Sequence, residues 1–546
     1  MKSRTSFFNA TVLRKDITRF APMWGLYLVG MLLICLGGFF ANEAVLSLAE
    51  TMGVTIGYFS IINFCYALIC AELLFGDLFN SRLCNALHAM PLRRESWFVH
   101  HLVSGIAFSV IPNLIVALCL IPQLGTYWFV SFIWVGGLTL SYLFFFGAAV
   151  LSAMCTGSRF AMALVYALIN FLSVLVLWLL KFLYEPLLFG IVIKTDGFIF
   201  LSPVSYLCMT ELNFLNFLDK INAFYNPQNG WPYLVWIAVA GVAMLAGALL
   251  LYRRRHLESA GDFITVRPLA PVFHVLYTLV AGIVLHLFTY LFGIEESYVF
   301  LAVGIAAGFF TGLMLLKRTV RVFKVSTFVG LAVMAAVVFG SMGLAKLDVL
   351  GIVNWMPKES SVKTVSVGYT YTGISYSTED AAEISELLSI HQLILDTRDE
   401  ADYGYPIELE YTLNDGSVVS REYTIDHDSK FSEELMPYFS KPECVFDTDD
   451  VPALLASVKY VDITDFTGNT AAVLLGEDIQ GFLNAVIADC EAGLTAQSWN
   501  YHDDAGHLGW AEIILPDDKA VHINMWSTFK NTVAWLEAHD IDLIAN

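Results

Sequence analysis

The stretch YWFVSFIWVGGLTLSYLFFFGAAVLSAM, residues 127–154, decides the fold class of this chain. It contains no Asp, Glu, Lys or Arg. An α-helix rises about 1.5 Å per residue, so about 20 apolar residues cross the hydrocarbon core of a bilayer, which is about 30 Å thick. Residues 127–154 are therefore predicted to form a membrane-spanning helix, long enough to be tilted.

Eight further segments pass the same test of length and hydropathy. They account for a composition that is 57% apolar and only 15% charged, whereas soluble domains average about a quarter charged residues. The sequence thus predicts a polytopic α-helical membrane protein with about nine transmembrane helices. The predicted spans are residues 20–40, 53–75, 101–122, 127–154, 161–183, 232–252, 272–292, 298–316 and 325–345.

Charge divides the chain into two parts. Residues 344–546 hold 10 Lys and Arg against 36 Asp and Glu, a formal charge of −26, while residues 1–343 hold 20 against 14, a charge of +6; together they give the −20 of the whole chain. An acidic segment is repelled by nucleic acid and by anionic lipid. We therefore expect no nucleic-acid partner, and we expect the two parts to lie in different compartments.

Lys and Arg recur in every second connection between the predicted spans. Because these residues are enriched in short cytoplasmic loops, we expect these connections and the N-terminus to face the cytoplasm, with the protein in the cell membrane. An odd number of spans then places the C-terminal part outside the cell. The cations that carry this expectation include Arg19, Arg82, Arg159, Arg253 and Arg318.

Residues 346–546 are predicted to form an acidic extracytoplasmic α+β domain. Alternating apolar residues in 407–413 and 418–425, around the turn Asn414-Asp415-Gly416, predict a β-hairpin. Apolar residues at spacings of three and four predict a helix over 381–396. Further strands are expected at 363–373, 458–466, 509–515 and 520–526, and further helices at 476–494 and 529–540.

The connection between the second and third predicted spans carries the most information about function. It reads FGDLFNSR (75–82) and then LHAMPLRRESWFVHHLVSG (87–105). A short amphipathic piece, a proline break and a basic pair, held at the surface by two spans, can transmit a push from a soluble partner. The alternative is a simple basic turn that follows the positive-inside bias. Glu72, near the end of the second span, is either an intramembrane carboxylate that changes partners or an interfacial one that reaches water.

Three stretches give the chain a family resemblance. SFFNATVLRKDITRFAPMWGLYLV (6–29) resembles the basic lead into the first span of permease subunits of the ABC-2 exporter type, and LHAMPLRR (87–94) resembles the connector after the second span. More narrowly, ISELLSIHQLIL (384–395) followed by IELEYTLNDGSVVSREYTI (407–425) resembles a Gram-positive bacterial subfamily with an appended extracytoplasmic domain of unknown function.

The resemblance implies a six-helix exporter-permease core over residues 1–256, with three further transmembrane helices over 257–345. It also implies a second permease copy or a paralogue, and cytosolic ABC ATPase subunits that bind ATP and Mg²⁺. This chain would itself carry no cofactor. The residues implied in coupling to the ATPase are Asp77, Arg82, His88, Pro91, Leu92, Arg93 and Arg94.

The sequence lacks the motif G-x-x-x-x-G-K-[ST] that holds ATP phosphates in P-loop proteins, so any such nucleotide site must belong to a partner. We expect no catalytic residue and no metal site in this chain, and hence a transporter subunit rather than an enzyme. The alternative is a membrane-anchored extracellular sensor or scaffold without transport. A lipid-modifying membrane enzyme would need several polar residues at membrane depth, and the sequence has few.

Two smaller patterns complete the expectations. Gly304, Gly308 and Gly312 recur every four residues in the eighth predicted span, a spacing that lets two helices approach closely. Packing within the chain is favoured over homodimerisation. Cys444 and Cys490 are the two cysteines of the acidic domain, and they form either a disulfide or a pair of buried thiols.

Overall fold

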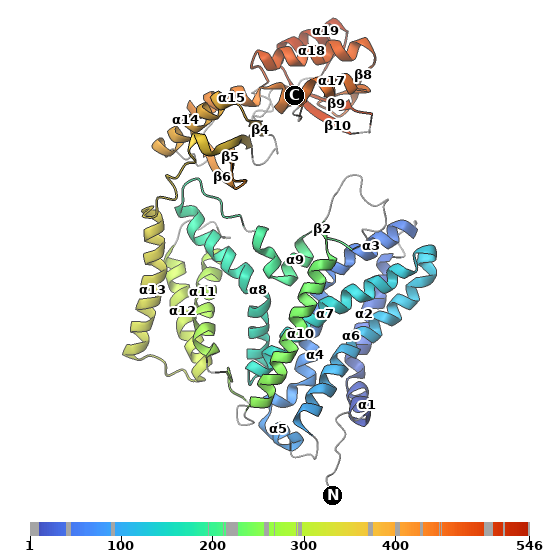
Figure 1. Cartoon of the computed structure of the whole chain (residues 1–546), viewed down its shortest axis with the longest axis vertical. Helices are drawn as coiled ribbons and strands as arrows, with labels where there is room; N and C mark the ends of the chain where they lie inside the picture. The colour runs from blue at the N-terminus through green and yellow to red at the C-terminus, as the bar shows by residue number, and fades with distance from the viewer. Residues whose placement is uncertain are drawn as a thin grey trace. The chain divides into compact units, whose positions relative to one another are not determined.

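A computed structural model of the chain (Figure 1) shows two compact units. The first comprises residues 1–182 and 194–341, and the second comprises residues 183–193 and 342–546. The structure describes residues 10–39, 45–88, 93–194, 196–210, 212–214, 228–255, 261–266, 268–290, 292, 298–369, 375–398, 405–425, 430–446, 448, 450–495, 506–516 and 519–543.

The first unit is helical apart from one pair of two-residue strands. Its helices are α1 (Ala10–Arg19), α2 (Ala21–Phe39), α3 (Val45–Tyr58), α4 (Ser60–Leu74), the 3₁₀ turn η1 (Gly76–Phe79), α5 (Ser81–His88), α6 (Arg94–Leu124), α7 (Phe129–Cys155), α8 (Arg159–Tyr184), α9 (Pro203–Met209), α10 (Trp231–Arg254), α11 (Leu269–Tyr290), α12 (Tyr298–Lys317) and α13 (Val325–Lys346), of which the ends of α8 and α13 reach into the second unit. The strands β1 (Leu212–Asn213) and β2 (Gln228–Asn229) are parallel.

Seven of these helices are long and apolar enough to cross a membrane, namely α6, α7, α8, α10, α11, α12 and α13. The first predicted span, 20–40, corresponds to α2, which follows α1 after a bend, and the second, 53–75, covers the end of α3 and all of α4, with a bend between them. The bend is 62° between α1 and α2 and 46° between α3 and α4. Among the described residues the count is thus seven, or up to nine if each bent pair is one span. The chain is a mostly helical, polytopic membrane protein.

α7, the helix of the opening stretch, lies among α4, α6 and α10 (Figure 1). Its contact with α10 is close because an added Cβ on Gly147 would lie 2.5 Å from the carbonyl oxygen of Gly241. Its contact with α4 includes polar groups, since Asn63 donates to the carbonyl of Leu138 (3.0 Å) and to the hydroxyl of Ser141 (2.7 Å). Such pairing is required where lipid offers no other partner.

The three glycines of α12 all face α11. An added Cβ would lie 2.8 Å from Cα of Gly282 at Gly304, 2.6 Å from Cβ of Ala281 at Gly308, and 3.0 Å from the His274 ring at Gly312. The stripe thus lies against another helix of the same chain, which is the arrangement that the sequence favoured.

The second unit contains two four-stranded antiparallel sheets of the same topology. In the first, β3 (Val362–Tyr369), β4 (Ser375–Thr378), β5 (Tyr405–Leu413) and β6 (Val418–Ile425) lie in the order β4-β3-β5-β6. In the second, β7 (Tyr460–Asp465), β8 (Thr470–Leu474), β9 (His507–Ile514) and β10 (Ala520–Trp526) lie in the order β8-β7-β9-β10. Each sheet thus repeats the strand order 2-1-3-4.

The helices follow the same repeat. α14 (Ala381–Thr397) joins the second and third strands of the first sheet, as α18 (Glu477–Glu491) does in the second. α15 (Lys430–Phe439) follows the last strand of the first sheet and α19 (Lys530–Ala538) that of the second, while α16 (Pro442–Val445) and α17 (Val451–Ser457) connect the two modules. The unit is therefore two tandem ββαββα modules, each with its own apolar core.

The two cysteines of this unit are free, buried thiols. Cys444 belongs to the core of the first module and Cys490 to that of the second. The Cys444 thiol donates to the carbonyl of Tyr438 (3.3 Å), and burial raises the pKa of Cys490 to about 12. Of the two alternatives that the sequence left open, the structure shows the buried thiols.

The two modules differ inside their cores. In the first, the fully buried His391 of α14 is hydrogen-bonded through Nε2 to the hydroxyl of Tyr423 (2.7 Å) and through Nδ1 to that of Tyr411 (2.8 Å). Matching the strand registers and the buried face of the helix assigns the equivalent positions of the second module to Val486, Ile513 and Met525. An apolar core satisfies the same topology, so the polar cluster is a particular feature of the first module.

The apolar segment 187–193 is not helical beyond the 3₁₀ turn Glu185–Leu187. Within the second unit, the carbonyl of Gly190 accepts a hydrogen bond from the amide of Glu422 in β6 (3.2 Å). Gly190 has φ +68°, and any Cβ there would lie 2.1 Å from the Tyr423 ring. Glycine is thus required where this segment extends the edge of the first sheet. PVSYLCM (203–209), by contrast, is helical as α9.

The buried histidine makes the first module sensitive to acid. Burial, with a smaller contribution from Arg421, lowers the pKa of His391 to about 4, whereas an unfolded histidine titrates near 6.5. The unfolded state therefore binds more protons between these values, and stability is lost as the pH falls from about 6.5 to about 4, by up to about 3 kcal/mol. His391→Gln, which does not titrate, should remove that pH dependence.

Hydrogen exchange of the α14 amides, corrected for intrinsic exchange rates, measures this effect between about pH 4 and pH 7 in the full chain. His522→Gln, at an exposed histidine of the second module, is the matched control and should behave as the wild type. An α14 whose protection falls equally with pH in the wild type and in His391→Gln would contradict the assignment.

Candidate functional site

The residues expected to couple to an ATPase lie between α4 and the start of α6. Asp77 lies half-buried in η1, while Arg82 in α5 and Arg93 before α6 are exposed. His88 is the last residue of α5, and its side chain is not described; Pro91 and Leu92 lie outside the described residues. We call residues 76–94 the connector. Its exposed cations lie where a soluble partner can reach them.

Arg255, directly after α10, fastens the connector to the helix ends around it. The Arg255 side chain is 9% exposed and its guanidinium donates to the carbonyls of Ala153 (2.6 Å) and Met154 (3.3 Å) at the end of α7, and to that of Leu78 (3.3 Å) in η1. Carbonyls at a helix C-terminus have no partner within the helix and carry partial negative charge. Burial lowers the pKa of Arg255, and the carboxylate of Asp77 acts in the opposite direction.

Arg94 forms the second attachment, at the first residue of α6. It donates to the carbonyl of Arg255 (2.9 Å), and its guanidinium lies 5.2 Å from the centre of the Tyr252 ring. The exposed pair Arg253–Glu95 (3.5 Å) spans the same two helices. Arg94 is thus partly buried in a structural role, and of the predicted basic pair Arg93 is the residue left to solvent.

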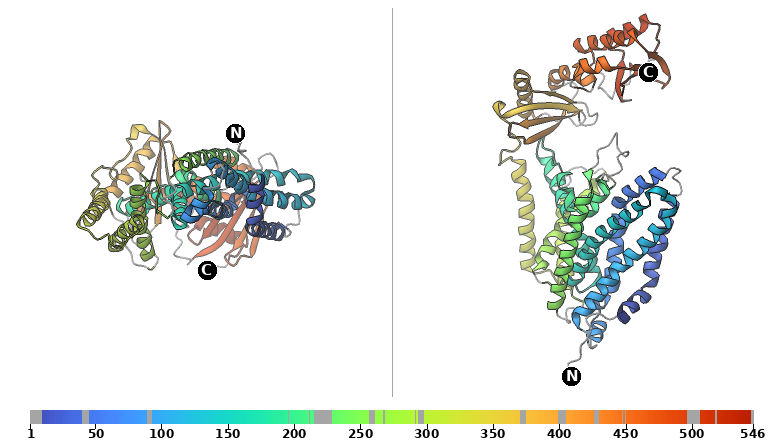
Figure 2. Two further views of the ribbon diagram at one scale, coloured as in Figure 1. Left: turned by 90° about the horizontal axis from the view of Figure 1, so that it is seen from below. Right: turned by 45° about the vertical axis from the view of Figure 1, so that its right-hand side comes forward.

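Further contacts join the other cation-bearing connections at the same end of the first unit (Figures 1 and 2). Glu72 of α4 pairs with Arg159 of α8 (3.6 Å), and both side chains are partly exposed. The amide of Gly157 donates to the carbonyl of Asp262 (2.9 Å), whose carboxylate lies 3.9 Å from Arg318 after α12. Glu72 is therefore a paired carboxylate with about one-third of its side chain exposed, rather than an isolated buried one.

The N-terminal helix is tied to this end as well. The carboxylate of Asp16 in α1, 6% exposed, lies 3.0 Å from Nδ1 of His101 and accepts from the hydroxyl of Ser104 (3.3 Å), both in α6. These contacts attach α1 directly to α6, so a displacement of α1 would be passed on to α6. Sequence reasoning missed both Asp16 and Arg255. The available signal was one carboxylate within the basic lead 6–29 and one extra arginine in the run 253–255.

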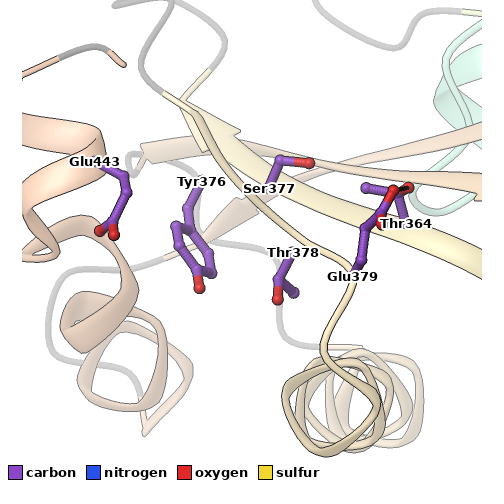
Figure 3. A pocket seen from close by; sticks show the side chains of 6 residues that line it. All are labelled: Thr364, Tyr376, Ser377, Thr378, Glu379 and Glu443. Carbon is purple, nitrogen blue, oxygen red and sulfur yellow. Dashed lines mark hydrogen bonds between the residues drawn. The ribbon is translucent and has the colours of Figure 1, made fainter. Parts of the chain in front are cut away.

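A second candidate site is a pocket of about 430 Å³ in the first module of the second unit (Figure 3). Tyr376 and Thr378 project from the same side of β4, and Glu443 approaches from α16. Hydroxyl and carboxylate oxygens dominate the lining, which consists of Thr364, Tyr376, Ser377, Thr378, Glu379 and Glu443.

The side chains of Tyr376, Glu383 and Lys441 form a hydrogen-bonded network at the Tyr376 side of this pocket. Lys441 donates to Glu383 (2.5 Å) and to the hydroxyl of Tyr376 (2.7 Å), and Tyr376 donates to the other oxygen of Glu383 (2.6 Å). Burial would raise the pKa of Glu383, but these hydrogen bonds outweigh it and lower the pKa to about 2. The charge of Lys441 is thus matched within this network.

No group of three or more His, Cys, Asp or Glu residues suited to a metal ion occurs in the described part of the chain. What the two sites offer instead is a fastened, cation-bearing connector and an oxygen-lined pocket.

The fastening of the connector predicts a specific loss of local stability. Arg255→Met should leave the carbonyls of Ala153 and Leu78 without this partner, at a cost of about 2–3 kcal/mol, because hydrogen bonds to charged groups are the stronger class, while the carbonyl of Met154 keeps its bond from Thr265. Hydrogen exchange over residues 76–88 should therefore accelerate. Arg254→Met, at the exposed neighbouring position, removes the same charge without these hydrogen bonds and should leave that exchange unchanged. Equal exchange in the two variants would contradict the role of Arg255.

Searches of protein-family models, curated proteins and solved structures find no match to this chain.

Proposed function

We propose that this chain is the membrane subunit of an ATP-driven ABC exporter, working by alternating access with a separate cytosolic ATPase subunit and with a second permease copy or paralogue. The observation that carries the proposal is the fastened connector. A soluble motor can move membrane helices only through an element that is exposed to it and rigidly joined to those helices. The described residues of the connector, 76–88 and 93–94, meet both conditions, through exposed Arg82 and Arg93 and through the hydrogen bonds of Arg255 and Arg94.

The direction of the force follows from these bonds. Arg255 joins the connector to the ends of α7 and α10, and Arg94 joins α6 to α10. At Gly147 and Gly241 the backbones of α7 and α10 pack directly on each other, so that we expect the two helices to move together. Movement of the connector would therefore tilt α6, α7 and α10 together, as alternating access requires. In this proposal the cation-bearing end faces the cytoplasm and the second unit lies outside the cell.

The alternative function is a membrane-anchored extracellular sensor or scaffold. The pocket in the first module favours it, because an oxygen-lined cavity suits ligand recognition. A sensor of this kind needs no ATPase, so the presence of an ATPase partner separates the two functions.

The exporter proposal predicts that the chain, purified from its native membrane in mild detergent, carries an ATP-hydrolysing subunit with it. Arg82→Glu/Arg93→Glu should reduce retention of that subunit by about tenfold or more, since placing like charges across an interface costs several kcal/mol. Both arginines are exposed, so the fold should be unaffected.

Arg321→Glu reverses an exposed cation of the α12–α13 connection and serves as the control, which should retain the partner. A wild-type chain that carries no ATP-hydrolysing protein would favour the scaffold, and a double variant that retains the partner fully would remove the connector from the proposal.

A further inference from the structure

The lining of the pocket in the first module suits a cation. Three of its side chains present aliphatic hydroxyls, from Thr364, Ser377 and Thr378, and two present carboxylates, from Glu379 and Glu443. An ammonium group has three hydrogen-bond donors and no acceptor, so it needs an arrangement of this kind. An anionic ligand would be repelled by these carboxylates and by the −26 charge of residues 344–546.

The carboxylates of the pocket are poorly neutralised by the protein itself. Glu379 lies 3.9 Å from Lys363, but both side chains are more than 60% exposed, and such pairs contribute little. No ion pair to Glu443 is found among the residues that the structure describes. Lys441 donates to the hydroxyl of Tyr376 in the lining, and its charge is matched by Glu383. Negative charge therefore remains at the pocket for a ligand to match.

The second module shows that the fold does not require this polar lining. Through the strand registers, Tyr376, Ser377 and Thr378 correspond to Ala472, Val473 and Leu474 of β8. The same edge strand is thus built from residues without hydroxyls, and Val473 is 52% exposed. Two modules of one topology satisfy the same structural demands, so the hydroxyls and carboxylates of the first module are free to serve binding.

We propose that the pocket bounded by β3, β4 and α16 binds an organic cation bearing primary ammonium groups, as on the lysine side chains of a basic peptide or in a polyamine. One ammonium group would lie against Glu379 and Thr364, which are hydrogen-bonded to each other (3.4 Å), and a second would lie against Glu443, on the far side of Tyr376 and Thr378 (Figure 3). The proposal does not rest on the transport function, because every residue that lines the pocket lies within the second unit.

The test is titration calorimetry on the full chain in detergent, at about physiological ionic strength, with pentalysine and spermidine as separate probes. Glu379→Gln/Glu443→Gln should weaken binding by about tenfold or more, because hydrogen bonds between charged groups are the strong class. Glu477→Gln/Asp478→Asn, at the exposed start of α18 in the second module, removes two charges at a similar topological position and should change affinity less than about twofold.

Tighter binding of pentalysine than of spermidine assigns the ligand to a basic peptide, and the reverse assigns it to a polyamine. Equal weakening by the two double variants would show only diffuse attraction to the acidic unit and would overturn the proposal. So would the absence of binding by either probe, or their complete displacement by Ca²⁺, which would make the pocket a divalent-cation site. All four substituted residues are exposed, so a failure to fold is not expected to obscure the result.

Discussion

The first unit depends on one buried guanidinium. Arg255 lies where α7 and α10 end and where the connector begins, and it donates to carbonyls of α7 and of the connector. Those carbonyls have no partner within their own helices, and water reaches a 9% exposed side chain poorly. The guanidinium holds its donors in a fixed planar fork, so that it can satisfy carbonyls on two different segments at once, whereas the donors of lysine all lie on one nitrogen. The connector thus acquires a fixed position relative to three helices, which is the property that a coupling element needs.

The second unit is built from two copies of one topology. Two modules share one strand order, yet one has a histidine and two tyrosines in its core and an oxygen-lined pocket at its edge, while the other has apolar residues at the equivalent positions. The comparison separates what the topology needs from what is particular to one module. The first module also receives the segment that follows α8, through Gly190 and Glu422. The buried histidine cluster and the pocket therefore lie in the same module that binds the segment after α8.

The sequence predicted the elements well wherever a single periodicity was strong. The hairpin 407–425 and the helix 381–396 are present as β5, β6 and α14, and the long apolar runs are helices. It failed where tertiary contacts decide. The bends at the starts of α2 and α4 leave the apolar composition unchanged, so hydropathy cannot reveal them. The segment 187–193 contains apolar residues that pack on the first module, since Phe189 lies against the Tyr423 ring.

At the candidate sites, too, the sequence revealed local patterns but not the contacts between distant segments. The connector was identifiable from its basic pair and proline, but the roles of Arg93 and Arg94 could not be distinguished until Tyr252 lay beside one of them. The tandem modules were missed although the tripeptide Ser-Val-Lys lies at or just before the first strand of each, beginning at Ser361 and at Ser457. The pocket unites strands and a helix more than sixty residues apart, from Thr364 to Glu443, and no local pattern reports such a meeting.

The central claim is that the connector faces the cytoplasm while the tandem modules lie outside the cell. Single cysteines introduced at Asn85 in α5 and at Val418 in β6, both exposed, can be labelled with a membrane-impermeant maleimide and compared with the wild type. The claim predicts labelling of Val418→Cys in intact cells and of Asn85→Cys only after the cells are opened. Labelling of Asn85→Cys in intact cells, or protection of Val418→Cys until lysis, would contradict it, because no cytosolic ATPase could then reach the connector.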